Sequence, residues 1–162
     1  MARRKIKIER RWQPDPVYNS VAVTRFINNI MKDGKKMKAQ KIFYSAMNYI
    51  KEKTGNDPFK LFQQALKNVA PNLEVWPRRI AGATYLVPRV VSSQRRFSKA
   101  VKWIIESARN KKGKPMYIKL AEEIISAANN EGDAVKKKQE MHRLAELNRA
   151  FAHFAWWGRK KK

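Results

Sequence analysis

Cysteine is absent from this chain of 162 residues. Its absence excludes disulfides, thiolate catalysis and zinc sites built on cysteine. Long apolar runs are missing too, because none approaches the roughly 18 to 20 residues that a membrane-spanning helix needs. The six glycines are all separated from one another, so the chain has no glycine-rich loop of the kind that cradles nucleotide phosphates.

Acidic and histidine side chains are too few and too scattered to suggest a catalytic site. The chain holds 13 Asp and Glu residues and two histidines, His142 and His153, which lie eleven positions apart. The adjacent carboxylates of Glu122 and Glu123 would point in different directions from a helix. The aspartates stand beside turns, where they most simply cap helices or close turns. We therefore predict no enzymatic activity, no metal and no cofactor.

Positive charge is what the chain has in excess. It carries 37 Lys and Arg residues and a formal net charge of +24. Such a charge destabilises a compact chain by self-repulsion, and an anionic polymer relieves that repulsion. The cations are spread over the whole chain rather than along one helix face, which favours nucleic acid over a membrane surface as the partner.

Apolar residues recur every three or four positions over most of the chain, which is the spacing of one-sided helices. The pattern predicts six helices, over about residues 20–33, 35–54, 58–70, 97–108, 117–130 and 133–148. Four phenylalanines lie on these apolar stripes and are expected in the core: Phe26, Phe43, Phe62 and Phe97. Trp103 lies off the stripe of its helix. The predicted fold class is therefore mainly α, with about six helices in one bundle-like domain.

Residues 73–91 read as the single β-hairpin of the chain, between the third and fourth helices. Its arms are rich in Val, Ile and Tyr, and its expected tip is Ala81–Thr84. Pro77 and Pro88 would remove donors from a central strand, so they favour a free two-stranded arm. An isolated hairpin is marginal in water, and we expect this arm to be mobile until it docks.

Three regions follow from this pattern. Residues 1–19 form a basic N-terminal arm that Pro14 and Pro16 keep out of a helix. Residues 20–148 form the helical domain with its hairpin arm, which we expect to bind the nucleic acid, and 149–162 form a basic, aromatic C-terminal tail. We expect both ends to be extended in the absence of a partner.

Basic clusters and exposed aromatic residues indicate how a nucleic acid would be held. Lys35, Lys36 and Lys38 open the second helix, where positive charge opposes the helix dipole and a phosphate ligand would explain it. Aromatic rings among the cations can stack on unpaired bases: Trp12, Trp76, Tyr85, Trp156 and Trp157. Two hypotheses remain open on these residues, a structural RNA-binding protein and an architectural DNA-binding protein with a basic β-ribbon arm.

Several segments in family order resemble small-subunit ribosomal protein seven, in its bacterial and organellar branch. They cover almost the whole chain: Pro14-Asp-Pro16, Met31-Lys-Asp-Gly-Lys-Lys36, Ala65-Leu-Lys-Asn-Val-Ala-Pro71, Arg78-Arg-Ile-Ala-Gly-Ala-Thr-Tyr-Leu-Val-Pro88, Ala134-Val-Lys-Lys-Lys138 and Asn148-Arg-Ala-Phe-Ala-His-Phe154. The resemblance implies six helices with a hairpin after the third. It also implies binding to the 3′ major domain of small-subunit rRNA, a part in nucleating assembly of the head, neighbouring head and platform proteins, and a place near exit-site tRNA and mRNA.

The resemblance and the basic clusters together assign the site residues. Those expected to contact rRNA are Arg3, Arg4, Lys5, Lys7, Arg10, Arg11, Lys35, Lys36, Lys38, Arg78, Arg79, Arg95, Arg96, Lys111, Lys112, Lys114, Lys136, Lys137, Lys138, His142 and Arg143. Those expected to face tRNA and mRNA are Ala81, Gly82, Ala83, Thr84, Tyr85, Arg149, His153, Trp156 and Trp157.

The chain departs from its relatives in two places on the hairpin. Trp76-Pro77 replaces a Lys-Ser or Lys-Ala pair, and Ala81 stands where glycine is common, so the tip is expected to differ from the usual geometry of the family. The ending Trp156-Trp157 is similar to plant mitochondrial members, and no presequence is evident at the N-terminus. The mitochondrial matrix is therefore the favoured compartment, with the bacterial cytoplasm and the plastid stroma as alternatives.

Overall fold

A computed structural model describes residues 12–155 and is mainly helical, as predicted. The described part holds six α-helices, one two-stranded hairpin between the third and fourth helices, and a final 3-10 helix. The elements are α1 (Val21–Ile30), α2 (Lys36–Thr54), α3 (Pro58–Val69), β1 (Leu73–Ile80), β2 (Ala83–Val90), α4 (Ser93–Asn110), α5 (Met116–Ala128), α6 (Asp133–Leu147) and η1 (Arg149–Ala155). None of the helices in this range is both long and apolar enough to cross a membrane.

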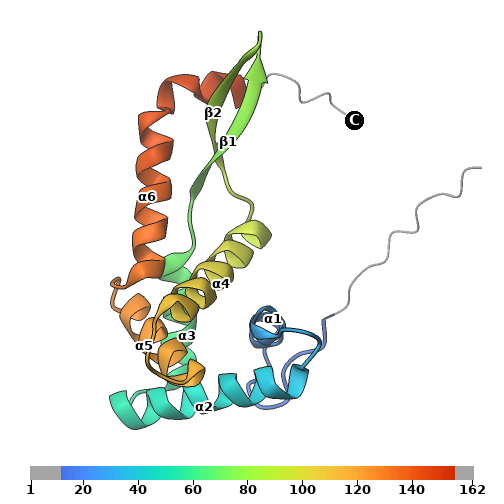
Figure 1. Cartoon of the computed structure of the whole chain (residues 1–162), viewed down its shortest axis with the longest axis vertical. Helices are drawn as coiled ribbons and strands as arrows, with labels where there is room; N and C mark the ends of the chain where they lie inside the picture. The colour runs from blue at the N-terminus through green and yellow to red at the C-terminus, as the bar shows by residue number, and fades with distance from the viewer. Residues whose placement is uncertain (1–11, 156–162) are drawn as a thin grey trace, which may run out of the picture.

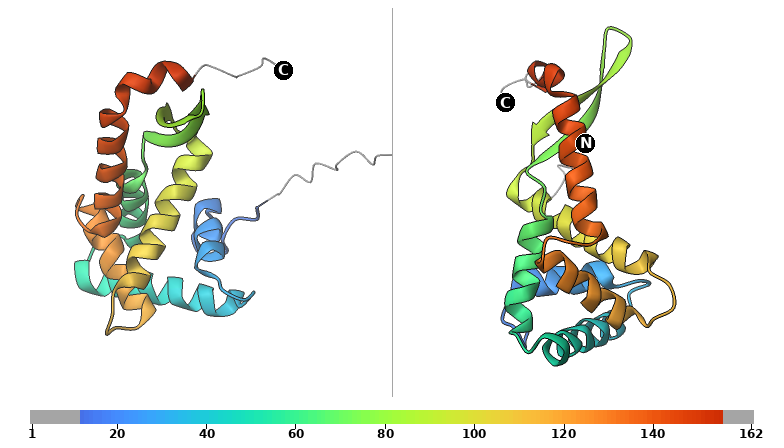
Figure 2. Two further views of the ribbon diagram at one scale, coloured as in Figure 1. Left: turned by 45° about the horizontal axis from the view of Figure 1, so that its top comes forward. Right: turned by 90° about the vertical axis from the view of Figure 1, so that its left-hand side faces the viewer.

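The molecule is elongated, with a helical body at one end and the hairpin at the other. Helices α1 to α5 make the body, and α2 lies across its far end (Figure 1). The hairpin and α6 extend from the body in the same direction, side by side, in all three views (Figures 1 and 2). Cationic side chains on the body and on the hairpin are therefore carried at opposite ends of one scaffold.

The core lies in the helical body, where three phenylalanine rings meet. Phe26, Phe43 and Phe62 are fully buried, with ring centroids 5.0 to 5.7 Å apart in tilted and edge-on pairs. Burying each such ring contributes roughly 1.5 to 3 kcal/mol. Phe97 was also predicted to be core, but it is only half-buried: it packs against the edge of the core, and the Arg25 guanidinium carbon lies 4.3 Å from its ring centroid.

The last residues of the predicted N-terminal arm are attached to the body. Asp15 is only 3% exposed. Its carboxylate accepts hydrogen bonds from the backbone N–H groups of Val17 and Tyr18, both at 3.1 Å, and from the Tyr44 hydroxyl at 2.7 Å. Burial and this bond raise the pKa of Tyr44 to about 12. The Pro-Asp-Pro segment thus folds as a turn on α2 rather than as part of an extended arm.

The hairpin turn is shorter than predicted. Ile80 pairs with Ala83, so only Ala81 and Gly82 form the turn, with φ of 47° and 85°. Positive φ at both central residues matches the right-handed twist of a hairpin, and Ala81 adopts it without being glycine. Ala83 and Thr84, which we assigned to the tip, belong to β2.

Both prolines are compatible with this ladder. Pro77 faces Leu86, and Pro88 faces Val75. Antiparallel pairs alternate between hydrogen-bonded and non-bonded, and counting from the Ile80–Ala83 pair puts both prolines in non-bonded pairs. Neither proline therefore removes a ladder hydrogen bond.

Within the described residues the hairpin is two-stranded and belongs to no larger sheet, as predicted, but it packs against other elements instead of standing free. Strand β1 packs on α6, and β2 packs on η1. The Tyr85 ring lies 5.1 Å from that of Phe151 and 5.5 Å from that of Phe154, and Val87 is buried. A two-stranded hairpin is marginal by itself, and here residues of the predicted C-terminal tail supply the apolar partner it lacks.

A buried glutamate joins α5 to α6. The Glu123 side chain is fully buried, its Oε1 accepts from the backbone N–H of Ala134 at 3.0 Å, and its Oε2 lies 2.6 Å from Lys111 Nζ. Asp133, one of the aspartates that we expected to cap a helix or close a turn, is instead the first residue of α6, and Gly132 occupies the cap position. Glu123 caps the helix from the neighbouring element because Gly132 leaves space for its carboxylate.

Replacing Gly132 by alanine is expected to destabilise the protein by about 2 to 3 kcal/mol. Its φ is +91°, and an added Cβ would lie 3.1 Å from both Glu123 Oε1 and Ser126 Cβ. Gly55→Ala is the matched control, because Gly55 has φ of +67° but nothing within 4 Å of an added Cβ. Urea unfolding should show a smaller loss, roughly 1 kcal/mol, for the control. Equal losses would mean that the contact with Glu123 is unimportant.

Candidate nucleic-acid interface

The predicted contact residues divide into those that already hold a protein partner and those that do not. The partnered group makes ion pairs or hydrogen bonds within the fold: Arg78, Arg95, Arg96, Lys111, Lys114, Lys136, Lys137, Lys138 and His142. The other group makes no ion pair to any described residue: Lys35, Lys36, Lys38, Arg79, Lys112 and Arg143. Arg3 to Arg11 and the two C-terminal tryptophans lie outside the described residues.

The first unpartnered cluster surrounds the start of α2. Lys35 occupies the cap position without a capping hydrogen bond, and the first turn contains no acid. The cluster consists of Lys35, Lys36 and Lys38, and all three side chains are exposed. This confirms that the helix begins in positive charge, which costs local stability near a helix N-terminus.

A cavity of about 280 Å³ opens beside this cluster. Its walls are mainly aliphatic, and its rim carries four cations, Lys32, Lys35, Lys38 and Arg109. The Arg109 guanidinium donates to the Ile30 carbonyl at 3.1 Å, so it is held at the rim. An apolar hollow edged by cations suits an unpaired base with its phosphates better than it suits a small neutral molecule.

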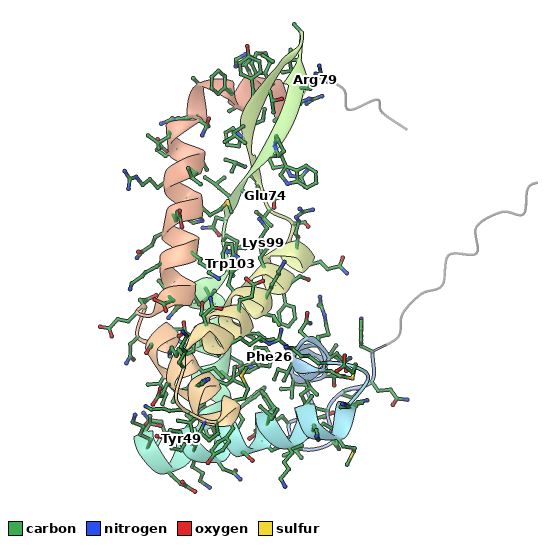
Figure 3. The ribbon with its side chains drawn as sticks, in the orientation of Figure 1. Phe26, Tyr49, Glu74, Arg79, Lys99 and Trp103 are labelled. Carbon is green, nitrogen blue, oxygen red and sulfur yellow. The ribbon has the colours of Figure 1, made fainter. Side chains whose placement is uncertain are left out.

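The second cluster lies on the hairpin, where the adjacent residues Arg78 and Arg79 have different surroundings. Strand alternation puts Arg78 and Arg79 on opposite faces. Arg78 Nη1 donates to the Phe154 carbonyl, so it fastens η1 to β1. Arg79 is exposed high on the hairpin, away from the helical body (Figure 3). The predicted pair therefore offers one unpartnered guanidinium to a ligand.

A buried carboxylate that sequence reasoning missed lies at the base of the hairpin. Glu74 is fully buried and accepts from Arg89 Nε at 2.8 Å, Arg95 Nε at 3.0 Å and the Trp76 indole N–H at 2.9 Å. Lys99 Nζ lies 2.8 Å away, and Figure 3 shows Glu74 and Lys99 close together between the hairpin and α4. One signal was available: Glu74 is the only acid between Asp57 and Glu106.

The surroundings of Glu74 favour its charged form. Burial disfavours ionisation, but hydrogen bonds from Lys99, Arg89 and Trp76 outweigh it and hold the pKa at about 2. The guanidinium carbons of Arg89 and Arg95 lie 4.3 and 4.7 Å from the Trp76 ring centroid, within cation–π range. The Trp76 ring, which we expected to stack on bases, is thus first a support for two arginines.

Helix α6 uses part of its predicted RNA-binding face to hold the hairpin. Lys138 Nζ donates to the Asn68 carbonyl at 2.7 Å, and His142 Nε2 accepts from the Asn72 N–H at 3.0 Å. Burial, Lys138 and Arg96 lower the pKa of His142, which agrees with its acceptor role. Lys137 pairs with Glu106 at 3.4 Å. Contact of these residues with rRNA stays a prediction.

Among the residues expected to face tRNA and mRNA, those that the structure describes lie together at the hairpin end. Ala81, Gly82, Ala83 and Thr84 are exposed, whereas Tyr85 packs on η1. On η1, His153 Nδ1 lies 2.8 Å from the Ala150 carbonyl oxygen, and Arg149 lies 3.4 Å from Glu146. The tip and η1 therefore form one surface, although their ligands stay a prediction.

Comparison with known proteins identifies the family. The family model described as Ribosomal protein S7p/S5e matches residues 2–149. Relatives named small ribosomal subunit protein uS7 include that of Thermotoga petrophila, 57% identical over 96% of this chain and 100% of the relative. That of Caldanaerobacter subterraneus is 59% identical over 88% of this chain and 92% of the relative.

These relatives are bacterial, so the mitochondrial preference finds no support, and neither does the DNA-binding alternative. The relatives are named as proteins of the small ribosomal subunit, in agreement with the prediction of no enzymatic activity. A match over nearly the whole length at this identity means that the chain belongs to the ribosomal protein S7p/S5e family.

Proposed function

We propose that this protein is a structural constituent of the small ribosomal subunit that binds its rRNA. The family assignment supports this role, since the relatives bear the name of a small-subunit protein. The observation that carries RNA contact is the cluster of Lys35, Lys36 and Lys38 beside an apolar cavity. Those lysines oppose the helix dipole, so they serve a ligand rather than the fold.

The shape of the molecule explains how it would bind. Side chains cannot read the deep groove of A-form RNA, so recognition uses phosphates, 2′-hydroxyls, shape and unpaired bases. Unpartnered cations lie on the helical body at α2 and on the hairpin at Arg79, far apart on the same molecule (Figure 3). The protein is thereby suited to hold two separate RNA segments in a set relation.

At a finer level, we place the protein on the 3′ major domain of small-subunit rRNA, where it helps nucleate assembly of the head. The hairpin tip and η1 face exit-site tRNA and mRNA, with head and platform proteins as neighbours. The exposed two-residue turn supports this, because it extends beyond the cationic base of the hairpin (Figure 1). The bacterial relatives favour a bacterial ribosome, in the cytoplasm.

Competition between an rRNA junction fragment and duplex DNA of equal length tests this proposal. At fixed salt the junction fragment should bind more tightly, because the unpartnered cations and the cavity suit folded RNA with unpaired bases. Cosedimentation with small subunits is the second measurement. Equal affinity for both nucleic acids, or failure to sediment with the subunit, would contradict it.

Arg79→Gln is expected to weaken rRNA binding about tenfold and to reduce the slope of log affinity against log salt by roughly 0.7 to 0.9. Arg79 is exposed and has no ion pair with a described residue, so its charge is available to phosphate. Arg79→Lys is the matched control, since it retains the charge and should preserve the slope. A slope that Arg79→Gln leaves unchanged would show that this side chain does not touch phosphate.

A further inference from the structure

We propose that Glu74 is a positioning residue that turns Arg89 and Arg95, with Trp76, into a preformed clamp for one RNA backbone phosphate at the base of the hairpin. The proposal rests on the proposed rRNA-binding function and adds a site to it. Arg89 and Trp76 were not assigned to RNA phosphate by the sequence, and Glu74 was assigned no role.

The hydrogen-bond pattern leaves the binding edges of both arginines available. Arg89 and Arg95 each bond Glu74 through Nε, at 2.8 and 3.0 Å. Neither guanidinium donates from an Nη atom to any residue in the described range. A guanidinium can hold a phosphate bidentately through its two terminal nitrogens. Glu74 therefore holds the two guanidinium groups through their Nε atoms and leaves their Nη atoms available to a ligand.

The clamp is accessible and rigid at once. The side chains of Arg89 and Arg95 are 43% and 42% exposed, and Trp76 is 40% exposed, whereas the carboxylate that holds them is fully buried. The Trp76 ring lies within 4.7 Å of both guanidinium carbons and donates to the same carboxylate. Long side chains that are fixed before binding lose less conformational freedom when they meet a phosphate.

The charge balance of the cluster still favours an anion. One carboxylate faces three cations, Arg89, Arg95 and Lys99, so the cluster retains positive charge. The direction in which RNA affinity changes when the charge of Glu74 is removed therefore tests the proposal. If Glu74 merely lowered the local positive charge, removing its charge would tighten RNA binding. If Glu74 positions the arginines, removing its charge weakens binding although the net charge of the protein rises.

The experiment compares Glu74→Gln with Glu52→Gln, using an rRNA junction fragment as the probe. Both variants raise the net charge by one, but Glu52 is exposed near the end of α2 and makes no ion pair with a described residue. We expect Glu74→Gln to bind about tenfold more weakly, with a salt slope lower by roughly 0.7 to 0.9. Glu52→Gln should bind as tightly as wild type or more tightly. Equal or tighter binding by Glu74→Gln overturns the proposal.

A surface variant keeps the test valid if Glu74→Gln folds poorly. Arg89→Lys retains the charge on an exposed side chain but removes the two-pronged group, and we expect it to weaken binding about fivefold. In the double variant, Glu74→Gln with Arg89→Lys, the two losses of RNA affinity should not add, because both substitutions break the same clamp. Wild-type affinity for Arg89→Lys, or full additivity in the double variant, overturns the clamp while RNA binding itself persists. If wild type binds no RNA, the proposed function and the clamp fail together.

Discussion

Reversing the charge of Lys35 and Lys36 is expected to weaken rRNA binding about a hundredfold while slightly stabilising the free protein. Binding falls because two phosphate contacts are replaced by repulsion, and the salt slope should drop by roughly 1.4 to 1.8. Stability rises because an acid near a helix N-terminus interacts favourably with the helix dipole, by about 0.3 to 1 kcal/mol for each change at low salt. Few surface substitutions are expected to move binding and stability in opposite directions.

The structural reason is the start of α2. Lys35 is the cap residue and Lys36 the first helical residue, and neither a capping hydrogen bond nor a first-turn acid offsets their charge. A glutamate at either position would supply the acid that this helix lacks. The measurements are filter binding over a salt series for the RNA complex and thermal unfolding for the free protein.

Lys51→Glu with Lys53→Glu is the matched control. It makes the same change of charge on the same helix, but in the last turn, where lysine is favourable. We expect this control to lose stability and to bind RNA far better than the first pair does. If both double variants weaken binding equally, affinity depends on net charge alone and the α2 cluster is not a specific contact.

Acid is expected to remove stability that Glu74 contributes, and Glu74→Gln should abolish that part of the acid sensitivity. The pKa of Glu74 falls from the ordinary 4.5 to about 2 in the folded protein. A depressed folded-state pKa contributes stability that is present above about pH 4.5 and is lost as the pH falls towards 2. The difference corresponds to about 3 kcal/mol between those limits.

The measurement is the free energy of unfolding at several pH values from 6 to 2, for wild type and Glu74→Gln. At pH 6 the variant should be less stable by about 3 kcal/mol, because three cations lose their shared buried partner. The two curves should converge near pH 2, where the wild-type carboxyl is half protonated. Parallel curves would contradict a charged Glu74 in the folded protein. Glu52→Gln should follow the wild-type curve.

Local patterns predicted the helices and the position of the hairpin well. The apolar stripes that contain Val23 and Ile104 are buried as expected, because a helix with one apolar face can bury that face only by packing it against the core. The stripe of the last helix was less informative. On its apolar stripe Ala145 is buried, whereas Met141 is half-buried and Leu144 is exposed, because α6 stands beside the hairpin instead of within the body.

The sequence by itself determined the mainly helical fold, the hairpin, the cationic character and the family, since each depends on composition or on patterns between near neighbours. Only the tertiary structure decided which cations are available to RNA. Glu74 meets Arg89 across the hairpin and Lys99 on the next helix, and Arg78 meets the carbonyl of Phe154. These partners are 15 to 76 positions apart, so no local pattern distinguishes a partnered arginine from a free one. That distinction sets the binding surface, because an arginine such as Arg78, whose terminal nitrogen is used within the fold, has less to offer a phosphate than Arg89, which bonds Glu74 through Nε alone.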